Sequence, residues 1–503
     1  MTELGNAWLL THFALDVRPL TKRCVLGSRP KVVQDVIETE SFPRQYLPAE
    51  TPLAHVEFAL KYDHLHLELL CEAFKRIPAE EVAAWVQKQP TGKWARRIGY
   101  LYEFLTGVDL HPQDLGVGGN YVLLLEPDEY VVAKIPVKVP RWRIEDNLLG
   151  DREFCPVVRQ TGAVKAALEL DVSARLQALL SQYPPEIYRR AVGYLYEKET
   201  RKSFEIERET PTPDREALFV AVLHDAGKTK LEDALSEVRL AGLQRSIVEP
   251  RYAQTAYRND QNYIGQTLLN YTQRVHFIPP PPQYVATLMR GLGRCLAKST
   301  GSNAISRAAI TAFGFVFVHP FDDGNGRLHR FLIHDVLAMD RFVPAGVILP
   351  VSAWMLNNIA SYDGCLESFS IPLMEKIRRN GGYVLDNDDQ LTIANPSVIE
   401  LFYRYPDMTV QVEYLARAIE GALSDELIPE LNFLQGRDRA KYAMRRIVDM
   451  PDRKLDNLIK FIHESRGVLS KNKRELYPEI SDDEMARLTD ACQEAFNTEP
   501  EPE

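Results

Sequence analysis

The chain of 503 residues is long enough for about three domains of ordinary size. Hydrophobic residues make up 45% of it and charged residues 26%, which is typical of a globular protein and excludes a disordered or fibrous chain. The net charge of -10 argues against a nucleic-acid-binding surface that covers the whole molecule.

Residues 1–160 are predicted to form an α+β domain. Apolar residues recur at helical spacing in 53–77 and 94–106, so helices are predicted there. Turn residues then flank two short apolar runs, 121–125 and 130–133, and this pattern predicts a small β-hairpin.

The middle of the chain, 161–375, is predicted to be a second domain. A helical pattern starts at about 164 and continues through Tyr196. The Thr-Pro-Thr-Pro sequence that ends at 213 predicts a stop and a linker.

Residues 376–503 are predicted to form a helical C-terminal domain. Turn-rich sequence follows 375, and amphipathic helices then lead to the acidic tail Glu-Pro-Glu-Pro-Glu. In 455–462 the apolar residues form a helical stripe, which predicts packing against neighbouring helices.

The cysteines and the apolar runs indicate where the protein resides. The six cysteines show no CxxC spacing, so reduced thiols are expected. The N-terminal sequence carries an acidic residue where a secretion signal carries positive charge, and the most apolar stretch, 310–318, is far shorter than the roughly 20 residues of a membrane span. We expect a cytoplasmic protein that does not interact with membranes.

One segment combines the residue types of a phosphoryl or nucleotidyl transfer site: His319-Pro-Phe-Asp-Asp-Gly-Asn-Gly-Arg-Leu-His-Arg330, between two apolar helical patterns. Glycines 324 and 326 just before a helix can direct several main-chain N–H groups at one anion. Arg327 and Arg330 lie three apart on one helical face and can reach further phosphate oxygens.

Two other side chains of this segment complete the predicted chemistry. Asp323 supplies a hard oxygen ligand that suits Mg²⁺. Histidine is the side chain whose ordinary pKa lies near neutral, so His319 is a candidate general base. Together with the anion-binding loop, these groups predict catalysis by positioning and electrostatics.

The segment resembles the signature of Fic proteins, His-x-Phe-x-(Asp/Glu)-Gly-Asn-Gly-Arg-x-x-Arg, at every fixed position. The resemblance implies a mainly α-helical fold, with a Fic-type helical core, a β-hairpin flap, an α+β N-terminal domain and a helical C-terminal domain. It also implies transfer of AMP from Mg·ATP to a Ser, Thr or Tyr hydroxyl of a protein, with release of pyrophosphate. Gly326 favours AMP, since relatives that transfer other groups commonly depart from the motif there.

The same resemblance implies a role for each residue of the motif. His319 takes the hydroxyl proton and Asp323 holds Mg²⁺, while Phe321 anchors the loop in the core. The nucleotide-binding residues of the motif are Asp323, Gly324, Asn325, Gly326, Arg327, Leu328, His329 and Arg330.

Upstream, 258–265 and 275–282 resemble the family's flap, which aligns an extended, hydroxyl-bearing segment of a target protein by main-chain pairing. The target includes the protein itself as a candidate. Tyr263, Ile264 and Gly265 are expected to lie against the nucleotide, and Tyr362 near the adenine. An ordinary hairpin with a Pro-rich linker, and a tyrosine packed in the core, are the structural alternatives.

Near 198–210 the chain resembles the inhibitory segment (Ser/Thr)-x-x-x-Glu-(Gly/Asn) of Fic proteins. Ser203 and Glu207 occupy the hydroxyl and carboxylate positions, at i and i+4 on one helical face. Glu207 is therefore expected to pair with Arg330 and inhibit the enzyme. Position 208 is Arg where the motif has Gly or Asn, which leaves a solvent-facing charge as the alternative for Glu207.

Two histidine patterns are similar to metal-binding patterns, but structural roles are favoured for both. His224-Asp-Ala-Gly-Lys228 resembles the metal-ligand motif of HD phosphohydrolases, but no histidine lies between His111 and His224 to complete it, so a helix end is favoured. His64 and His66 lie two apart in a predicted helix and so point in different directions, which favours packing over metal binding.

The hypothesis from the sequence is a self-inhibited protein adenylyltransferase. The alternatives are a Fic-fold transferase of phosphate or another nucleotide, and a regulatory protein that only senses nucleotide. Twelve Lys or Arg against five Asp or Glu in 437–474 indicate either a solvated helical face or a surface for nucleic acid or protein.

Overall fold

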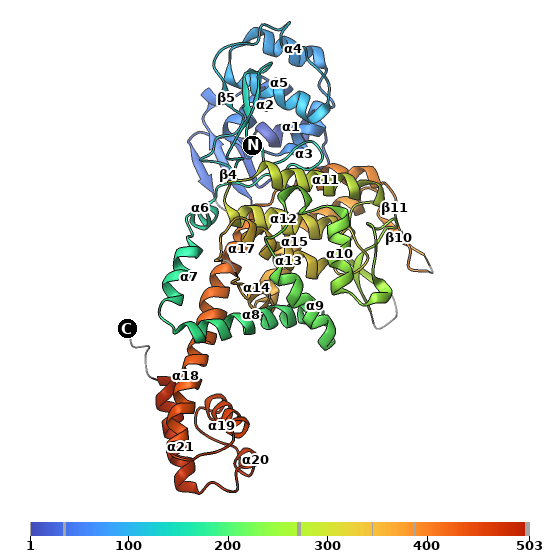
Figure 1. Ribbon diagram of the computed structural model, residues 1–503. Coiled ribbons are helices and arrows are strands. Elements are labelled where there is room, and N and C mark those ends of the chain that lie inside the picture. Colours follow the sequence, from blue (N-terminus) through green and yellow to red (C-terminus); the bar gives the residue numbers. More distant parts are fainter. Residues whose placement is uncertain (1, 34–36, 269–272, 345, 387, 498–503) are drawn as a thin grey trace. The chain divides into compact units, whose positions relative to one another are not determined.

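The computed structural model describes residues 2–33, 37–268, 273–344, 346–386 and 388–497. The chain is mainly helical with small sheets, as predicted (Figure 1). It divides into two compact units. The first unit contains Met1–Leu170, Ala221–Asp340 and Asn358–Ala416, and the second contains Asp171–Val220, Arg341–Asn357 and Arg417–Glu503. The domain boundaries at 160 and 375 stay predictions.

Up to residue 146, the described residues of the first unit form two small sheets and five α-helices. One sheet has the order β1-β2-β4-β3, with β2 and β4 parallel, and the other has the order β5-β7-β6. The strands are β1 (Glu3–Leu4), β2 (Lys22–Leu26), β3 (Lys31–Val33), β4 (Glu38–Phe42), β5 (Val122–Leu123), β6 (Val137–Val139) and β7 (Ile144–Asp146). The helices are α1 (Gly5–His12), α2 (Pro52–Tyr62), α3 (Leu67–Phe74), α4 (Ala79–Lys88) and α5 (Lys93–Thr106), and a 3-10 turn covers Arg44–Tyr46.

Two sequence predictions in this part were wrong. The single helix expected over 53–77 is two helices, because Asp63 leaves the helix to accept the Asn6 amide and His66 then caps α3. The hairpin expected between 121–125 and 130–133 does not form. β5 pairs in parallel with β7 instead, because the tertiary fold brings a later strand beside it.

The elements that carry the site motif lie in the first unit. α12 (Ala304–Val318) is buried along its whole length, as a helix without a polar face must be, and it packs on α13 (Asn325–Met339). The other elements of this part of the first unit are α6 (Gly162–Leu168), α10 (Glu237–Ile247), α11 (Pro282–Lys298), α15 (Ile359–Arg379), β8 (Ile264–Thr267), β9 (Gln273–Phe277), β10 (Tyr383–Leu385), β11 (Leu391–Ile393) and α16 (Glu400–Arg404). There are also 3-10 turns at Leu231–Asp233, Pro250–Tyr252 and Pro396–Ile399. The motif therefore sits in a loop between two buried helices, as predicted.

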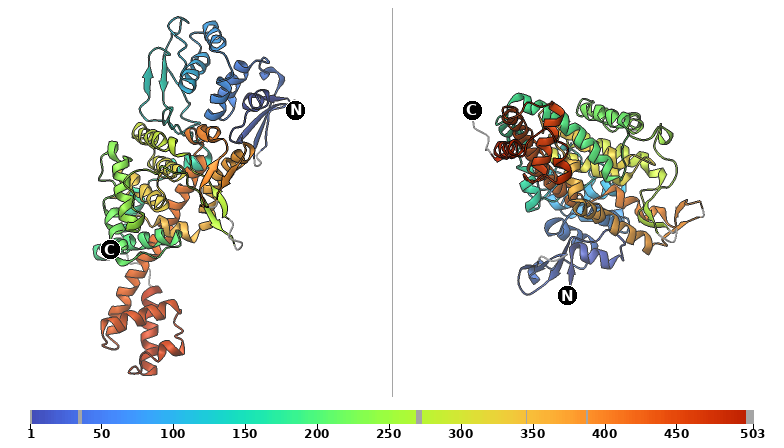
Figure 2. Two further views of the ribbon diagram at one scale, coloured as in Figure 1. Left: turned by 90° about the vertical axis from the view of Figure 1, so that its right-hand side faces the viewer. Right: turned by 90° about the horizontal axis from the view of Figure 1, so that it is seen from below.

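The second unit is helical. Its elements include α7 (Val172–Leu180), α8 (Pro185–Ile206), α14 (Val351–Asn357), a π-helical turn at Ala422–Leu427, α18 (Ile428–Arg445), α19 (Asp452–Glu464), α20 (Lys471–Arg474) and α21 (Asp482–Asn497). α9 (Pro213–His224) and α17 (Thr409–Gly421) cross the boundaries between the units. α18, α19 and α21 pack on one another, and they lie in the red part of the chain in Figure 2. The predicted stripe at 455–462 is confirmed, because Leu455, Leu458, Ile459 and Ile462 all lie in this C-terminal core. The acidic tail lies outside the described residues.

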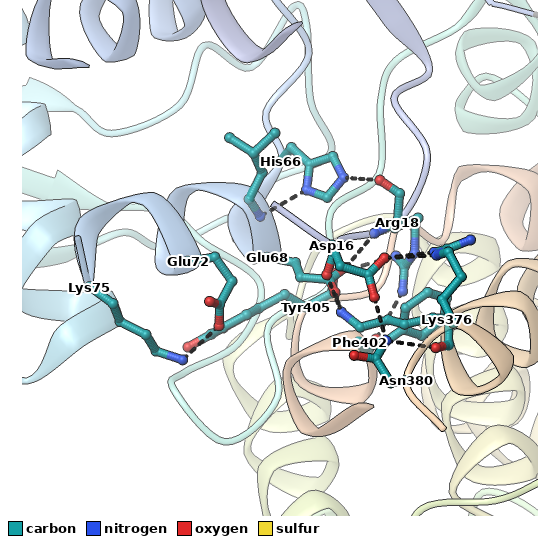
Figure 3. Close-up of polar contacts among 12 residues, drawn as sticks. Asp16, Arg18, His66, Glu68, Glu72, Lys75, Lys376, Asn380, Phe402 and Tyr405 are labelled. Atoms are coloured by element: carbon teal, nitrogen blue, oxygen red, sulfur yellow. Dashed lines mark hydrogen bonds and ion pairs between the residues drawn. The ribbon is translucent and has the colours of Figure 1, made fainter. Parts of the chain in front are cut away.

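Within the first unit, a polar cluster joins the N-terminal segment to the end of α15 (Figure 3). Lys376 donates to the Glu68 carboxylate at 2.6 Å, and both side chains are buried. The Arg18 guanidinium stacks over the Phe402 ring at 4.1 Å. The cluster fixes the C-terminal end of α15, whose middle packs against β9.

Candidate active site

His319 stands at the C-terminal end of α12 in the left-handed conformation, with φ 51° and ψ 60°. This conformation is unfavourable for a residue with a Cβ, so the surrounding structure must hold it. The ring nitrogen Nδ1 lies 3.2 Å from the Val316 carbonyl. Because a carbonyl can only accept, Nδ1 carries the proton and Nε2 is left as the basic nitrogen.

The carbonyl oxygens of the motif loop are held mostly by side chains from an upstream segment. This pattern fixes the loop before helix α13 starts. The acceptor and donor pairs are His319 O with Arg258 Nε (2.9 Å), Pro320 O with Arg258 N (2.9 Å), Phe321 O with Asn325 Nδ2 (2.7 Å) and Asn262 Nδ2 (3.1 Å), and Asp323 O with Gln244 Nε2 (3.2 Å). With these carbonyls occupied, the loop presents amides rather than carbonyls to an incoming anion.

Gly324 is the N-cap of α13 and has φ +88°. A Cβ at this position would also lie 2.8 Å from Cγ1 of Val248, so no other residue fits without strain. The helix that follows is 15 residues long, and the first amides of such a helix have no acceptor within it. These amides and the helix dipole suit an anion, and the anion-binding role of the loop stays a prediction.

Asn325 and Phe321 close the loop from inside. Asn325 is 1% exposed, and its side-chain amide bonds both the N–H and the C=O of Phe321. The Phe321 ring is fully buried and packs edge-on against Tyr257, as the anchoring role predicted. Both buried side chains therefore fix the shape of the loop from its interior side.

The charged residues of the motif lie around the start of α13. Arg327 and Arg330 are each 1% exposed, and Arg327 donates to Asp323 Oδ1 at 2.6 Å. Asp323 itself is partly exposed, with 40% of its side chain accessible. A partly accessible carboxylate at this position suits Mg²⁺, which keeps several waters and binds mainly through substrate phosphates, and the metal-binding role of Asp323 stays a prediction.

The predicted flap is confirmed as a hairpin, with β8 and β9 antiparallel and an irregularity between Ile264 and Gly265. Residues 269–272 lie outside the described residues. All four residues of β8 are exposed, while Val275 and Phe277 of β9 are buried. Within the described residues β8 pairs with β9 alone, which leaves one strand edge for another chain.

An aromatic cluster supports the flap and the motif loop together. Phe317, two residues before His319, stacks on Phe369 of α15 with centroids 4.0 Å apart. Phe277 of β9 packs on both rings, at 6.4 and 6.3 Å. The base of the flap and the end of α12 therefore share one core.

Three further predicted nucleotide-binding residues also have buried side chains. Tyr362 is 4% exposed and stacks beside His329, while Leu328 and His329 are fully buried. Burial lowers the pKa of His329 to about 3, so its ring is neutral. Leu328 and His329 could reach a nucleotide only through their main chain. The roles of all three stay predictions. Tyr263, by contrast, is half-buried beside the exposed Ile264 and Gly265 of the flap.

Ser203 and Glu207 lie at the end of α8 in the second unit. Ser203 is buried and Glu207 is exposed. Arg208 has φ +59°, its amide bonds Glu205 O, and the Glu209 amide bonds Phe204 O. This is the Schellman helix ending, which places a left-handed residue directly after the Glu. Arg208 thus keeps the main-chain shape that Gly or Asn adopts readily.

The histidines of the two other patterns lie at a helix end and in a break between helices. α9 ends at His224, and Gly227 follows with φ +76°. His64 and His66 lie in the break between α2 and α3 and bond Thr21 and main-chain groups there. Among the described residues, no three His, Cys, Asp or Glu side chains are grouped as metal ligands would be.

Several residues that sequence reasoning missed hold the loop in place. Gln244 is fully buried in α10, and Gln254 and Asp322 exchange two hydrogen bonds at 2.8 and 2.9 Å. Arg258 and Asn262 bond the loop carbonyls directly. Gln244 offered a signal, since it interrupts an otherwise apolar stripe of its helix.

The basic stretch 437–474 forms many ion pairs with nearby carboxylates. Of the twelve cations in 437–474, seven form ion pairs: Arg437, Lys441, Arg445, Lys454, Lys460, Lys473 and Arg474. This pairing favours the solvated face. Where the chain is described, no helix combines the length and apolar character that crossing a membrane requires.

The six cysteines are all buried and unpaired with one another, in agreement with the expected reduced thiols. Burial raises the pKa of Cys71 to about 11 and that of Cys155 to about 12. Both thiols are therefore protonated and unreactive at neutral pH.

Comparisons with known proteins agree with this site. A model of the Fic/DOC family matches residues 234–337. Protein adenylyltransferase fic-1 of Caenorhabditis briggsae is 35% identical over 96 residues, which are 19% of this chain and 17% of that protein. Protein adenylyltransferase Fic of Drosophila ananassae is 32% identical over 96 residues, also 19% and 17%. The match thus spans less than a fifth of either relative.

A solved structure of a Fic family protein from Desulfovibrio desulfuricans G20 is 18% identical, covers 63% of this chain and 87% of its own, and has a TM-score of 0.36. The match to the family model covers α10, the flap, α11, α12 and most of α13, which are the elements that build the site. Residues 234–337 of this chain therefore match the Fic/DOC family, and this match covers about a fifth of the chain.

Proposed function

We propose that this protein transfers AMP from Mg·ATP to a Ser, Thr or Tyr hydroxyl of a protein. The observation that carries the proposal is the geometry of His319, whose Nδ1 is bonded to Val316 O beside the N-terminus of α13. In this proposal, Nε2 of His319 is the base and the N-terminus of α13 binds the phosphates. The curated relatives that share this segment are named protein adenylyltransferases.

In the proposed reaction, the acceptor hydroxyl oxygen attacks the α-phosphorus of ATP while Nε2 of His319 takes its proton. The bond from the α-phosphorus to the bridging oxygen breaks, and pyrophosphate leaves. The amides of 324–326 stabilise the negative charge on the phosphates, and Arg327 and Arg330 neutralise the leaving group. Asp323 would hold Mg²⁺, which supplies charge neutralisation between phosphate oxygens.

The exposed edge of β8 supports a protein target. A strand edge binds an extended segment through main-chain hydrogen bonds, so it selects backbone conformation more than sequence. Gly265 contributes because a Cβ there would lie 2.7 Å from the Arg274 carbonyl. An acceptor hydroxyl in such a segment would be presented in a fixed register.

We further propose that Glu207 inhibits the enzyme. The support is its position at a Schellman ending with the buried Ser203 one turn earlier, as in the inhibitory motif. The carboxylate would compete with a phosphate for Arg330. Removing it is therefore expected to raise the rate of transfer.

The test is incubation of the protein and candidate targets with α-labelled or γ-labelled ATP and Mg²⁺. The α label should become covalently attached in the wild type or in Glu207→Gly, and not in His319→Ala. Attachment of the γ label would instead establish a phosphotransferase. No covalent label in any variant, with nucleotide still bound, would establish a nucleotide sensor.

Glu205→Gly is the matched control for inhibition, because Glu205 lies in the same last turn of α8 and is also exposed. Glu207→Gly should label faster than the wild type, while Glu205→Gly should not. Equal labelling by both variants would show that Glu207 has no specific inhibitory role.

A further inference from the structure

Arg258 is 3% exposed and lies at the base of the flap, shortly before β8 begins. All three nitrogens of its guanidinium donate to main-chain carbonyl oxygens. Nε bonds His319 O at 2.9 Å, Nη1 bonds Asp260 O at 2.9 Å, and Nη2 bonds Pro280 O at 2.5 Å. Its own amide bonds Pro320 O at 2.9 Å.

These acceptors belong to three separate stretches of chain. Asp260 precedes β8, Pro280 follows β9, and His319 ends α12. One side chain therefore ties both ends of the flap to the main chain of the candidate general base. Asn262 repeats the connection more weakly, through one bond to Phe321 O at 3.1 Å.

The charge of Arg258 is kept although the group is buried. Burial lowers the pKa of Arg258 to about 10, which still leaves the guanidinium protonated at neutral pH. A charged donor makes stronger hydrogen bonds to carbonyls than a neutral one. A guanidinium also fixes three directions at once, which the single ammonium of Lys cannot do.

We propose that Arg258 is a positioning residue that holds the left-handed main chain of His319 and both ends of the flap in one geometry. This inference rests on the proposed function, because it gives Arg258 the role of placing His319, the proposed general base, relative to the target segment that the edge of β8 would bind. The strained conformation of His319 supports it, since such a conformation persists only where neighbours hold it. Arg258 touches neither the phosphates nor the acceptor in this scheme.

The experiment compares Arg258→Lys and Arg258→Met with Arg307→Lys. Arg307 is a matched control because it is also 3% exposed and donates hydrogen bonds to Leu296 O and Ser299. It forms an ion pair with Asp340, and none of these three partners belongs to the motif loop. At a temperature where all variants are folded, both Arg258 variants should lose about 10- to 100-fold in kcat for transfer of the α label. Their affinity for Mg·ATP, measured by calorimetry, should change by less than about threefold, because the first main-chain amides of α13 are unchanged.

A second measurement does not depend on activity. In hydrogen exchange without ATP, amides of 319–323 and of β8 and β9 should exchange about tenfold faster in Arg258→Lys than in Arg307→Lys, and α4 and α5 should be unchanged. Unchanged exchange in the loop and flap, or unchanged kcat per folded molecule, would overturn the positioning role. If the wild type transfers no label, the proposed function fails and the exchange result alone decides the role of Arg258.

Discussion

At the residue scale, the site depends on main-chain conformations that few side chains tolerate. His319 has a positive φ in spite of its Cβ, and Gly324 has one where a Cβ would also collide. The first is held by a hydrogen bond from Arg258 to its carbonyl, while the second depends on the absence of a side chain. The two positions therefore respond to substitution in different ways.

Gly324→Ala should destabilise the first unit by about 1–3 kcal/mol, since it combines a left-handed Ala with a contact at 2.8 Å to Val248. It should also weaken Mg·ATP binding, because relief of the contact moves the first amides of α13. Gly242→Ala is the control: no atom lies within 4 Å of its Cβ, and an Ala in helix α10 should stabilise by about 0.5–1 kcal/mol. Urea unfolding checks both values, and equal stability of the two variants would contradict the prediction.

Arg208 presents the opposite case, a non-Gly residue at a position that favours Gly. With φ +59° at the Schellman ending, Arg208→Gly should stabilise the second unit by up to about 1 kcal/mol, while Arg208→Ala should not. Thermal unfolding of the full chain measures the change. A lower midpoint for Arg208→Gly than for the wild type would contradict the prediction and show that the Arg208 side chain contributes a compensating contact.

At the element scale, the start of α3 makes the first unit sensitive to acid. His66 Nδ1 accepts from the Leu69 amide and Nε2 lies 3.0 Å from Arg18 O, so the ring must be neutral with the proton on Nε2. Burial accordingly lowers the pKa of His66. Burial also lowers the pKa values of His55 and His64 to about 4.

Because the folded state disfavours protonated His66, its contribution to stability is complete above the unfolded pKa of about 6.5 and is lost as pH falls below it. His66→Asn keeps the cap without titrating, so it should lose less stability between pH 7 and 5 than the wild type. His111→Asn, at an exposed position, should match the wild type. Thermal midpoints at several pH values test this, and parallel curves for His66→Asn and wild type would refute it.

The cluster at the end of α15 contains a buried ion pair whose partners come from distant parts of the chain. Lys376→Met should destabilise by about 3–5 kcal/mol, because it leaves the Glu68 carboxylate buried without its cation. Lys376→Met with Glu68→Gln should recover a large part of that loss. Urea unfolding of the single and double variants gives the coupling, and additive losses would exclude it.

At the scale of the whole molecule, net charge says little about local surfaces. Many cations of the basic stretch 437–474 form ion pairs with carboxylates of this stretch or of neighbouring segments. Each paired cation therefore adds little to the positive electrostatic potential of the surface. We expect the full chain to elute from immobilised DNA below about 100 mM salt. Retention at higher salt that is lost in Arg446→Glu with Arg453→Glu would instead support a nucleic-acid surface.

The sequence by itself determined the features that are local in the chain. The helix–loop–helix around His319, the hairpin at 258–282 and the helical stripe at 455–462 follow from spacing and turn residues that act over a few positions. The motif also identified the charged groups at the start of α13, because its fixed spacing leaves little freedom in their placement. The helix expected over 53–77 failed where Asp63 bonds Asn6, a partner 57 positions away.

What only the tertiary structure decided are the contacts between distant segments. The pairing of β5 with β7, the ion pair of Glu68 with Lys376, and the three carbonyls held by Arg258 join residues that no periodicity connects. The same holds for the alternation of the chain between two units. The physical reason is that a hydrogen bond or ion pair depends on separation in space, and only the folded chain sets that separation.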